Sequence, residues 1–377
     1  MAVKFSEKDE KRYRMLLAVV NLMVLLALYI NSTASWKAFR ETPLVEAATR
    51  HEAAAGSSFF FDSGLFEPVP VFALKAAMWL GVSPGSAVRA QGIALFCMTG
   101  FITLAMARRR YGELAGMMGA MFFAANPFMG YYAMQGDSHL FALLFMIFFW
   151  RIFNPADLTP RRAVIAGIWG GLACLSRADS AWFILLCVPF YALFYRAQFK
   201  PKLAALALGV SLAVFTPYLA YQKASFGGFL HGQELRLKQW SVRSEAARPA
   251  GGPETLSVTG FLFREGPARA AGYFSSGLVR VLSYELPRGV YYKIVIPFIF
   301  LGFYALFGAG RHDLAVFFLA SLVPILPLAS SGAAEAGLAQ RFLLAPAWAL
   351  FLAGGFGMQW SAELLQKKAV EYFGGKK

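Results

Sequence analysis

The chain has 377 residues, of which 58% are hydrophobic and only 15% are charged. A soluble domain carries about a quarter charged residues, so this composition excludes an ordinary soluble protein and predicts a chain that crosses a membrane many times. The formal net charge of +15 does not indicate a nucleic-acid partner, because the basic residues form short clusters between apolar segments. Such clusters are typical of the cytoplasmic loops of membrane proteins.

Ten apolar segments are predicted to span the membrane. They cover residues 15–30, 89–107, 114–129, 138–153, 163–175, 181–195, 203–221, 290–308, 314–328 and 342–359. The run Pro70–Val82 is too short to span and contains Lys75, so it is predicted to be a helix lying at the membrane interface. The predicted fold class is therefore an all-α polytopic membrane protein that forms one domain over residues 1–377.

The positive-inside rule orients these spans. With the N-terminus in the cytoplasm, the basic clusters all fall on the cytoplasmic side, at residues 108–110, 161–162, 196–202, 311 and 367–368. Residues 1–14 and 361–377 are then cytoplasmic basic tails, and residues 33–87 and 222–289 are outer loops. The basic start could belong to a signal peptide, but the many later spans favour an uncleaved anchor. The predicted location is the cell (inner) membrane.

The first outer loop concentrates carboxylates. It holds five of the 21 acidic residues, namely Glu41, Glu46, Glu52, Asp62 and Glu67. A carboxylate beside a membrane is costly to keep partly dehydrated, which makes these residues functional candidates. The alternative for each of them is a solvated surface position, since acids can also be purely structural.

Four charged residues from other segments fall on the same outer face as this loop. They are Asp137, Arg177, Asp179 and Arg341. Acids and arginines from separate parts of the chain are thus predicted to converge on one side of the membrane.

Several short motifs follow one another along the chain. In order they are Arg40-Glu41, Glu67-Pro68-Val69-Pro70 with Gly81-Val82-Ser83, Ala124-Ala125-Asn126-Pro127 with Asp137, Gly171-Leu172-Ala173-Cys174-Leu175-Ser176-Arg177, Pro217-Tyr218 with Phe226-Gly227, and Arg341-Phe342-Leu343-Leu344-Ala345-Pro346. In this order the motifs resemble those of the GT-C-fold glycosyltransferases that use polyprenyl-phosphate-linked sugars, similar to protein O-mannosyltransferases and the lipid A aminoarabinose transferase. The resemblance covers most of the chain and implies a GT-C-like bundle of about ten transmembrane helices.

The reaction that the resemblance implies is transfer of a sugar from a lipid phosphate to an acceptor hydroxyl or amine on the outer face. A base must take the proton of the acceptor, and Glu41 occupies the acidic position of the family. The alternative for Glu41 is an acid at a helix start near Pro43. Asp137 is a second catalytic candidate that could contact the acceptor or ligate a metal, although capping of the helix that it opens would also explain it.

The phosphate leaving group needs positive charge, and arginine forks match phosphate oxygens. Arg177 and Arg341 are the first candidates for binding it, because each borders a span on the outer face. The alternative for both is snorkelling to lipid headgroups. The predicted substrate-binding set is completed by Lys75, Arg264, Asp62 and Glu67.

Two other functions stay open at this stage. The acidic pair of the family is reduced here to one acid with Arg40 beside it, which would suit a non-catalytic GT-C-like structural or assembly subunit of a membrane complex. A secondary transporter is disfavoured, because its acids would lie near mid-span. The expected partners are a polyprenyl-phosphate sugar donor, membrane lipids and an acceptor that the sequence does not name. No metal ligand is predicted, and a divalent metal cofactor stays open.

Overall fold

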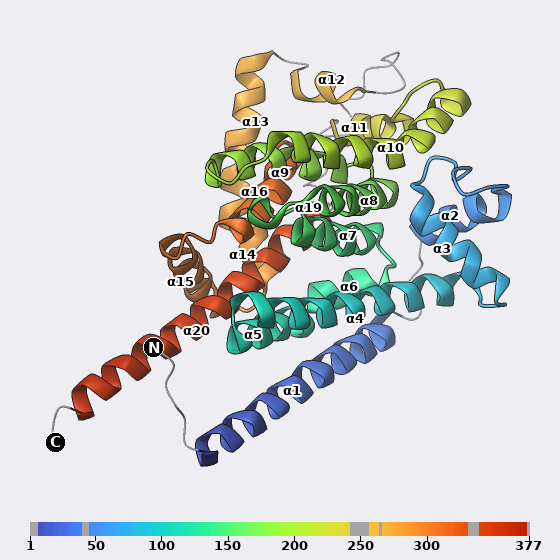
Figure 1. Ribbon diagram of the computed structural model, residues 1–377. Coiled ribbons are helices and arrows are strands. Elements are labelled where there is room, and N and C mark those ends of the chain that lie inside the picture. Colours follow the sequence, from blue (N-terminus) through green and yellow to red (C-terminus); the bar gives the residue numbers. More distant parts are fainter. Residues whose placement is uncertain (1–6, 40–44, 242–255, 264–265, 331–338, 375–377) are drawn as a thin grey trace.

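The computed structural model describes residues 7–39, 45–241, 256–263, 266–330 and 339–374, and every regular element in these ranges is helical (Figure 1). In chain order the α-helices are α1 (Glu7–Phe39), α2 (Val45–Gly56), α3 (Pro68–Trp79), α4 (Pro84–Tyr111), α5 (Glu113–Ala125), α6 (Pro127–Met134), α7 (Ser138–Ile152), α8 (Pro160–Ser176), α9 (Ser180–Phe194), α10 (Pro201–Phe226), α11 (His231–Ser241), α12 (Val258–Phe263), α13 (Pro267–Arg280), α14 (Leu286–Val290), α15 (Val295–Gly308), α16 (Asp313–Leu322), α17 (Leu326–Ala329), α19 (Ala339–Phe342) and α20 (Leu344–Gly374). A π-helical turn, η3 (Val281–Glu285), joins α13 to α14.

Prolines and short polar residues set several helix starts. Proline occupies the first turn of α3, α4, α6, α8, α10 and α13, where its missing N–H costs nothing. The Asn126 side chain caps α6 by accepting hydrogen bonds from the backbone N–H groups of Phe128 and Met129. Asn126 therefore ends the predicted span 114–129 at Ala125 and turns the chain into the separate helix α6.

Length and composition identify two helices, α4 and α10, that can cross a membrane by themselves among the described residues. Two bent pairs add to these if each counts as one span: α6 with α7, bent by 117°, and residues 267–290 with α15, bent by 111°. Three shorter apolar helical segments, of 10–17 residues, are Glu113–Ala125, Ser180–Phe194 and Asp313–Ala329. These helices agree with a protein that crosses the membrane, and the number of ten spans stays a prediction.

The helices pack in layers through small residues. In Figure 1, α8 lies between α7 and α10, and α20 runs beside α15 and α5. A Cβ at Gly302 of α15 would lie 1.8 Å from the carbonyl oxygen of Ala353 on α20, so only glycine allows this approach. Small residues at such contacts are typical of helices packed in membranes.

The first outer loop does not stand apart from the bundle. After α2, residues 57–67 lie against the end of α10, where Gln222 donates a hydrogen bond of 2.7 Å to the carbonyl of Gly64. Helix α3 follows with 12 residues, a length of about 18 Å that cannot cross the roughly 30 Å hydrocarbon core. The predicted outer loop 222–289 is largely helical: α11 lies beside α10, and α12 and α13 follow it along the chain.

Candidate functional site

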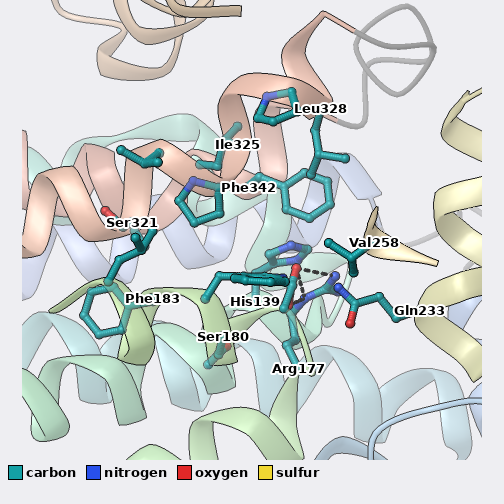
Figure 2. A pocket seen from close by; sticks show the side chains of 18 of the residues that line it. His139, Arg177, Ser180, Phe183, Gln233, Val258, Ser321, Ile325, Leu328 and Phe342 are labelled. Atoms are coloured by element: carbon teal, nitrogen blue, oxygen red, sulfur yellow. Dashed lines mark hydrogen bonds and ion pairs between the residues drawn. The ribbon is translucent and has the colours of Figure 1, made fainter. Parts of the chain in front are cut away.

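A cavity of about 310 Å³ lies where the turn between α8 and α9 meets α11, α12, α17 and the start of α20. Figure 2 shows its lining, with His139, Arg177 and Phe342 close to one another. Charged and imidazole groups gather on one part of its wall. We call these groups, together with Asp137 directly behind them, the cavity cluster: Glu67, Asp137, His139, Arg177, Asp179, Arg236 and Arg341.

Arg177 is the most buried arginine of the cavity cluster, with 2% of its surface exposed. It ends α8 in an extended conformation, which directs its side chain out of the helix. Its Nε and Nη2 donate to both carboxylate oxygens of Asp179, at 2.9 to 3.2 Å, and its Nη1 donates to Ser138 Oγ at 3.0 Å. Such two-pronged pairing fixes the guanidinium in place.

Glu67 joins the two outer loops. Its carboxylate accepts hydrogen bonds from Arg236 of α11 at 2.7 Å and from the backbone N–H of Ala178 at 3.3 Å. Burial raises the pKa of Glu67, but the Arg236 and Arg177 cations outweigh burial and hold this pKa below its usual range. Glu67 is therefore an ionised bridge between the loop before α3 and the start of the second outer loop.

Asp137 caps α7 and links two other members of the cavity cluster. One carboxylate oxygen accepts the backbone N–H of His139 at 2.9 Å and also contacts Nδ1 of that ring. The other oxygen lies 4.0 Å from Nη1 of Arg341 on α19. The capping role that sequence position predicts for Asp137 is confirmed, and the carboxylate has an ionic role in addition.

The remaining wall of the cavity is apolar. Aromatic and aliphatic side chains come from α7, α9, α11, α12, α13, the segment 321–328, α19 and the start of α20 (Figure 2): Ala142, Met146, Trp182, Phe183, Leu186, Leu237, Val258, Phe261, Leu262, Phe274, Val323, Pro324, Ile325, Pro327, Leu328, Phe342, Leu344 and Ala345. A site with one charged part and a long apolar part suits an amphipathic ligand, because each half of the ligand meets surroundings of matching polarity.

The predicted site residues divide into three groups. Glu67, Arg177 and Arg341 line the cavity, and Asp137 contacts two lining residues. Asp62 and Lys75 do not line it. Glu41 and Arg264 lie outside the described residues, so their roles stay predictions.

The two predicted residues away from the cavity have structural partners instead. The Asp62 carboxylate accepts hydrogen bonds from the Ser58 N–H at 2.8 Å and from the Tyr221 hydroxyl at 3.0 Å. Lys75 donates to the carbonyl and hydroxyl of Ser57. Both residues hold the segment after α2 in place, which explains their charges without a substrate.

His139, Asp179, Arg236 and Gln233 line the cavity but were not among the predicted site residues. His139 and Asp179 each lie two residues after a predicted one, and that spacing was the available signal. Arg236 and Gln233 come from a stretch that was expected to be an irregular polar loop. Only the tertiary fold brings α11 to Glu67.

The part of the chain that the structure describes contains no candidate metal site. No three His, Cys, Asp or Glu side chains there lie together as a metal ion would require. In the cavity cluster, the carboxylates of Glu67, Asp137 and Asp179 contact arginine or histidine.

Comparison with known proteins supports the resemblance given by the motifs. The sequence model of the dolichyl-phosphate-mannose-protein mannosyltransferase family matches residues 67–221, somewhat less than half of the chain. A solved structure, the archaeal oligosaccharyltransferase AglB from Archaeoglobus fulgidus in complex with an inhibitory peptide and a dolichol-phosphate, superposes with a TM-score of 0.53 and 14% identity. The chain has the GT-C glycosyltransferase fold. No curated protein matches it.

The GT-C likeness has a defined extent. The superposition covers 99% of this chain but 53% of the AglB chain, so this chain spans about half the length of that solved protein. The family match starts at Glu67 and ends at Tyr221, and it includes Asp137 and Arg177. The all-helical fold and the integral membrane setting are thereby confirmed, whereas the inner membrane and the cytoplasmic termini stay predictions.

Proposed function

We propose that this protein is a membrane glycosyltransferase that moves a sugar from a polyprenyl-phosphate donor to an acceptor on the outer face of the membrane. The observation that carries the proposal is the cavity, in which arginines stand beside an extended apolar wall. A polyprenyl-phosphate sugar has the same division, with an anionic sugar phosphate on an apolar chain. The family match and the dolichol-phosphate bound in the AglB structure support this class of donor.

The arginines supply what the leaving group requires. As the bond from sugar to phosphate breaks, negative charge grows on the phosphate oxygens, and fixed cations stabilise that charge. Arg177 is held by Asp179 and Ser138, and Arg341 lies near Asp137, so both are positioned before a donor binds. Arg236 is a third cation at the same cavity and was not expected from the sequence.

Replacement of Arg341 by alanine tests the donor site. Because the phosphate contact acts on the bound donor and on the transition state, both the affinity for dolichyl phosphate and the kcat/KM for dolichyl-phosphate mannose should fall. A charge-assisted hydrogen bond contributes roughly 1.5–3 kcal/mol, so each should fall by about 10- to 100-fold. Native mass spectrometry measures the binding, and release of dolichyl phosphate from sugar-labelled donor measures turnover.

Arg162→Ala is the matched control for this experiment. Arg162 pairs with Asp157 and does not line the cavity, and its side chain is 49% exposed. Its loss should leave both quantities unchanged. If Arg341→Ala binds dolichyl phosphate as tightly as the wild type does, the arginine-lined cavity is not the donor site.

A non-catalytic GT-C-like subunit is the second candidate, and one observation favours it. Every carboxylate of the cavity cluster already has a partner: Glu67 has Arg236, Asp179 has Arg177, and Asp137 has His139. An acid held this way is a weak base. A wild-type protein that binds dolichyl phosphate but never releases it from a sugar-linked donor would support this candidate.

A further inference from the structure

His139 is the one group of the cavity cluster that combines burial with an unused acceptor atom. Its Nδ1 contacts the carboxylate of Asp137, and the same carboxylate oxygen accepts the His139 backbone N–H, so Asp137 fixes one nitrogen of the ring. A carboxylate only accepts hydrogen bonds, so Nδ1 carries the hydrogen and Nε2 of the neutral ring keeps its lone pair. Nε2 is buried and has no hydrogen-bond partner among the described residues, although the ring lines the cavity.

The ring stands beside the proposed phosphate site. Phe342 meets it edge to face, with 4.7 Å between the ring centroids (Figure 2). The guanidinium carbons of Arg177 and Arg341 lie 5.5 and 5.7 Å from the centroid of the same Phe342 ring. Phe342 therefore lies next to His139 and next to both arginines, so the ring of His139 and the proposed phosphate-binding arginines line the same part of the cavity.

We propose that His139 is the base of the sugar transfer and that Asp137 positions its ring; this inference rests on the proposed function. The acceptor oxygen forms a bond to the anomeric carbon while the bond from that carbon to the phosphate oxygen breaks. The electron pair of the broken bond leaves with the polyprenyl phosphate. The proton of the acceptor hydroxyl passes to Nε2 of His139 and later to water.

Charge distribution favours imidazole over the neighbouring carboxylates for this step. Glu67 and Asp179 each pair with an arginine, and a carboxylate beside a cation is a weaker base. The neutral imidazole of His139 pairs through Nδ1 with Asp137, which leaves the lone pair of Nε2 to accept a proton. Asp137 would hold the imidazole of His139 in one tautomer, as the carboxylate does in the catalytic triads of hydrolases.

His139→Asn is the deciding variant. The amide nitrogen of asparagine can replace Nδ1 as the donor to Asp137, but nothing replaces Nε2. General-base catalysis contributes about 10²- to 10⁴-fold, so release of dolichyl phosphate from dolichyl-phosphate mannose should slow by about that factor. Affinity for dolichyl phosphate should change less than about two-fold, because the base acts in the transition state.

The dependence of the rate on pH separates a base from a structural strut. The wild-type rate should fall toward acid pH as the ring becomes protonated, and His139→Asn should lack that fall. The charged groups that face the ring, Asp137 of its own turn, Arg177 and Asp179 of the α8–α9 turn, and Arg341 of α19, stay in place in this variant. Asp137→Asn should keep part of the rate, since it misplaces the ring without removing it.

Each result decides the proposal. Wild-type rate and pH profile in His139→Asn would overturn it, and a matching loss in Glu41→Gln alone would give the role to Glu41. Should His139→Asn fail to fold, Asp137→Asn decides, because a wild-type rate and pH profile in that variant would exclude a histidine base that Asp137 positions. A wild-type protein that binds dolichyl phosphate yet releases it from no sugar-linked donor contradicts the proposed function itself.

Discussion

Helix α7 has a buried polar cluster at each end, and the two clusters differ in one decisive respect. The cavity cluster includes Asp137, which caps the start of α7. The other, which we call the α16 cluster, consists of Arg110, Tyr111, Trp150 and Asp313, with Trp150 in the last turn of α7. The ends of α7 are about 20 Å apart.

The α16 cluster closes on itself. The Asp313 carboxylate accepts from Arg110 at 2.6 Å and from the Tyr111 hydroxyl at 2.7 Å, while its carbonyl accepts from the Trp150 indole at 2.7 Å. None of these four residues lines the described cavity. Their network joins α4, α7 and the start of α16, and a structural role accounts for it.

Burial and ion pairing therefore do not distinguish the two ends. Both ends also contain buried polar atoms that have no hydrogen-bond partner among the described residues: Tyr191 Oη and His312 Nδ1 near the α16 cluster, and His139 Nε2 in the cavity cluster. The difference is the cavity, which gives a ligand room beside the charges. A buried charge pair is weak evidence of function unless there is space for a substrate next to it.

The largest expected difference between the two ends is the compartment that each faces. In a protein lacking Cys97, Cys174 and Cys187, a cysteine at exposed Glu52 of α2 should react with an impermeant thiol reagent added outside intact cells. A cysteine at exposed Arg161, just beyond the α16-cluster end of α7, should react only after the cells are opened.

Labelling of both positions from outside would contradict the predicted topology and the assignment of the cavity to the outer face. Labelling from outside of the cysteine at position 161 alone would mean that the chain has the opposite orientation in the membrane.

Removal of one arginine from each cluster tests whether the α16 cluster is only structural while the cavity cluster also binds a ligand. Arg110→Ala and Arg177→Ala each leave a carboxylate without its cation, which typically costs about 3–5 kcal/mol for buried pairs. Only Arg177→Ala should also weaken dolichyl-phosphate binding, by at least about 10-fold. Unfolding in denaturant and native mass spectrometry measure the two effects.

Arg177→Lys extends this test. We expect this variant to be more stable than Arg177→Ala, because lysine keeps a cation beside Asp179. Lysine keeps the positive charge but cannot reproduce the fork that contacts both Asp179 oxygens and Ser138. It should bind dolichyl phosphate more weakly than wild type and more strongly than Arg177→Ala. Equal losses of lipid binding in Arg110→Ala and Arg177→Ala would remove the distinction between the clusters.

Local sequence features predicted those parts of the site that local chemistry controls. Asp137 at a helix start, Arg177 at a helix end and the break at Asn126-Pro127 all occur where the residue types require them. Arg110 shows the limit, because it was expected in a solvent-facing basic cluster and instead pairs with Asp313, 203 residues later in the chain.

The remaining part of the site depends on contacts between distant segments. No periodic apolar pattern marks α11, so its placement of Arg236 against Glu67 follows only from the folded chain. Helix boundaries differ from the predicted ones for a related reason. Polar and proline residues at the ends, as at Pro84 and Tyr111 of α4, lie in helix but carry no apolar signal.

The smallest expected effect is a loss of stability in acid, and it concerns Asp179. Burial raises the pKa of this carboxyl, but the Arg177 cation outweighs burial and lowers the pKa from 3.8 to about 2. A pKa depressed by folding stabilises the folded state fully above the unfolded pKa, and this stabilisation is lost as the pH falls through the folded pKa. The window is therefore pH 4 to pH 2, and the contribution is on the order of 2 kcal/mol.

Asp179→Asn should remove this contribution. The free energy of unfolding should be lower than that of the wild type at pH 5 and should fall less steeply between pH 4 and pH 2, with Glu67 accounting for part of the slope that remains. Asp157→Asn is the control, because Asp157 is 59% exposed in its pair with Arg162 and should leave the wild-type slope unchanged. If the free energy of unfolding depends on pH in the same way for Asp179→Asn and the wild type down to pH 2, Arg177 does not hold Asp179 ionised. Asp179 would then not be what fixes Arg177 in place for phosphate binding.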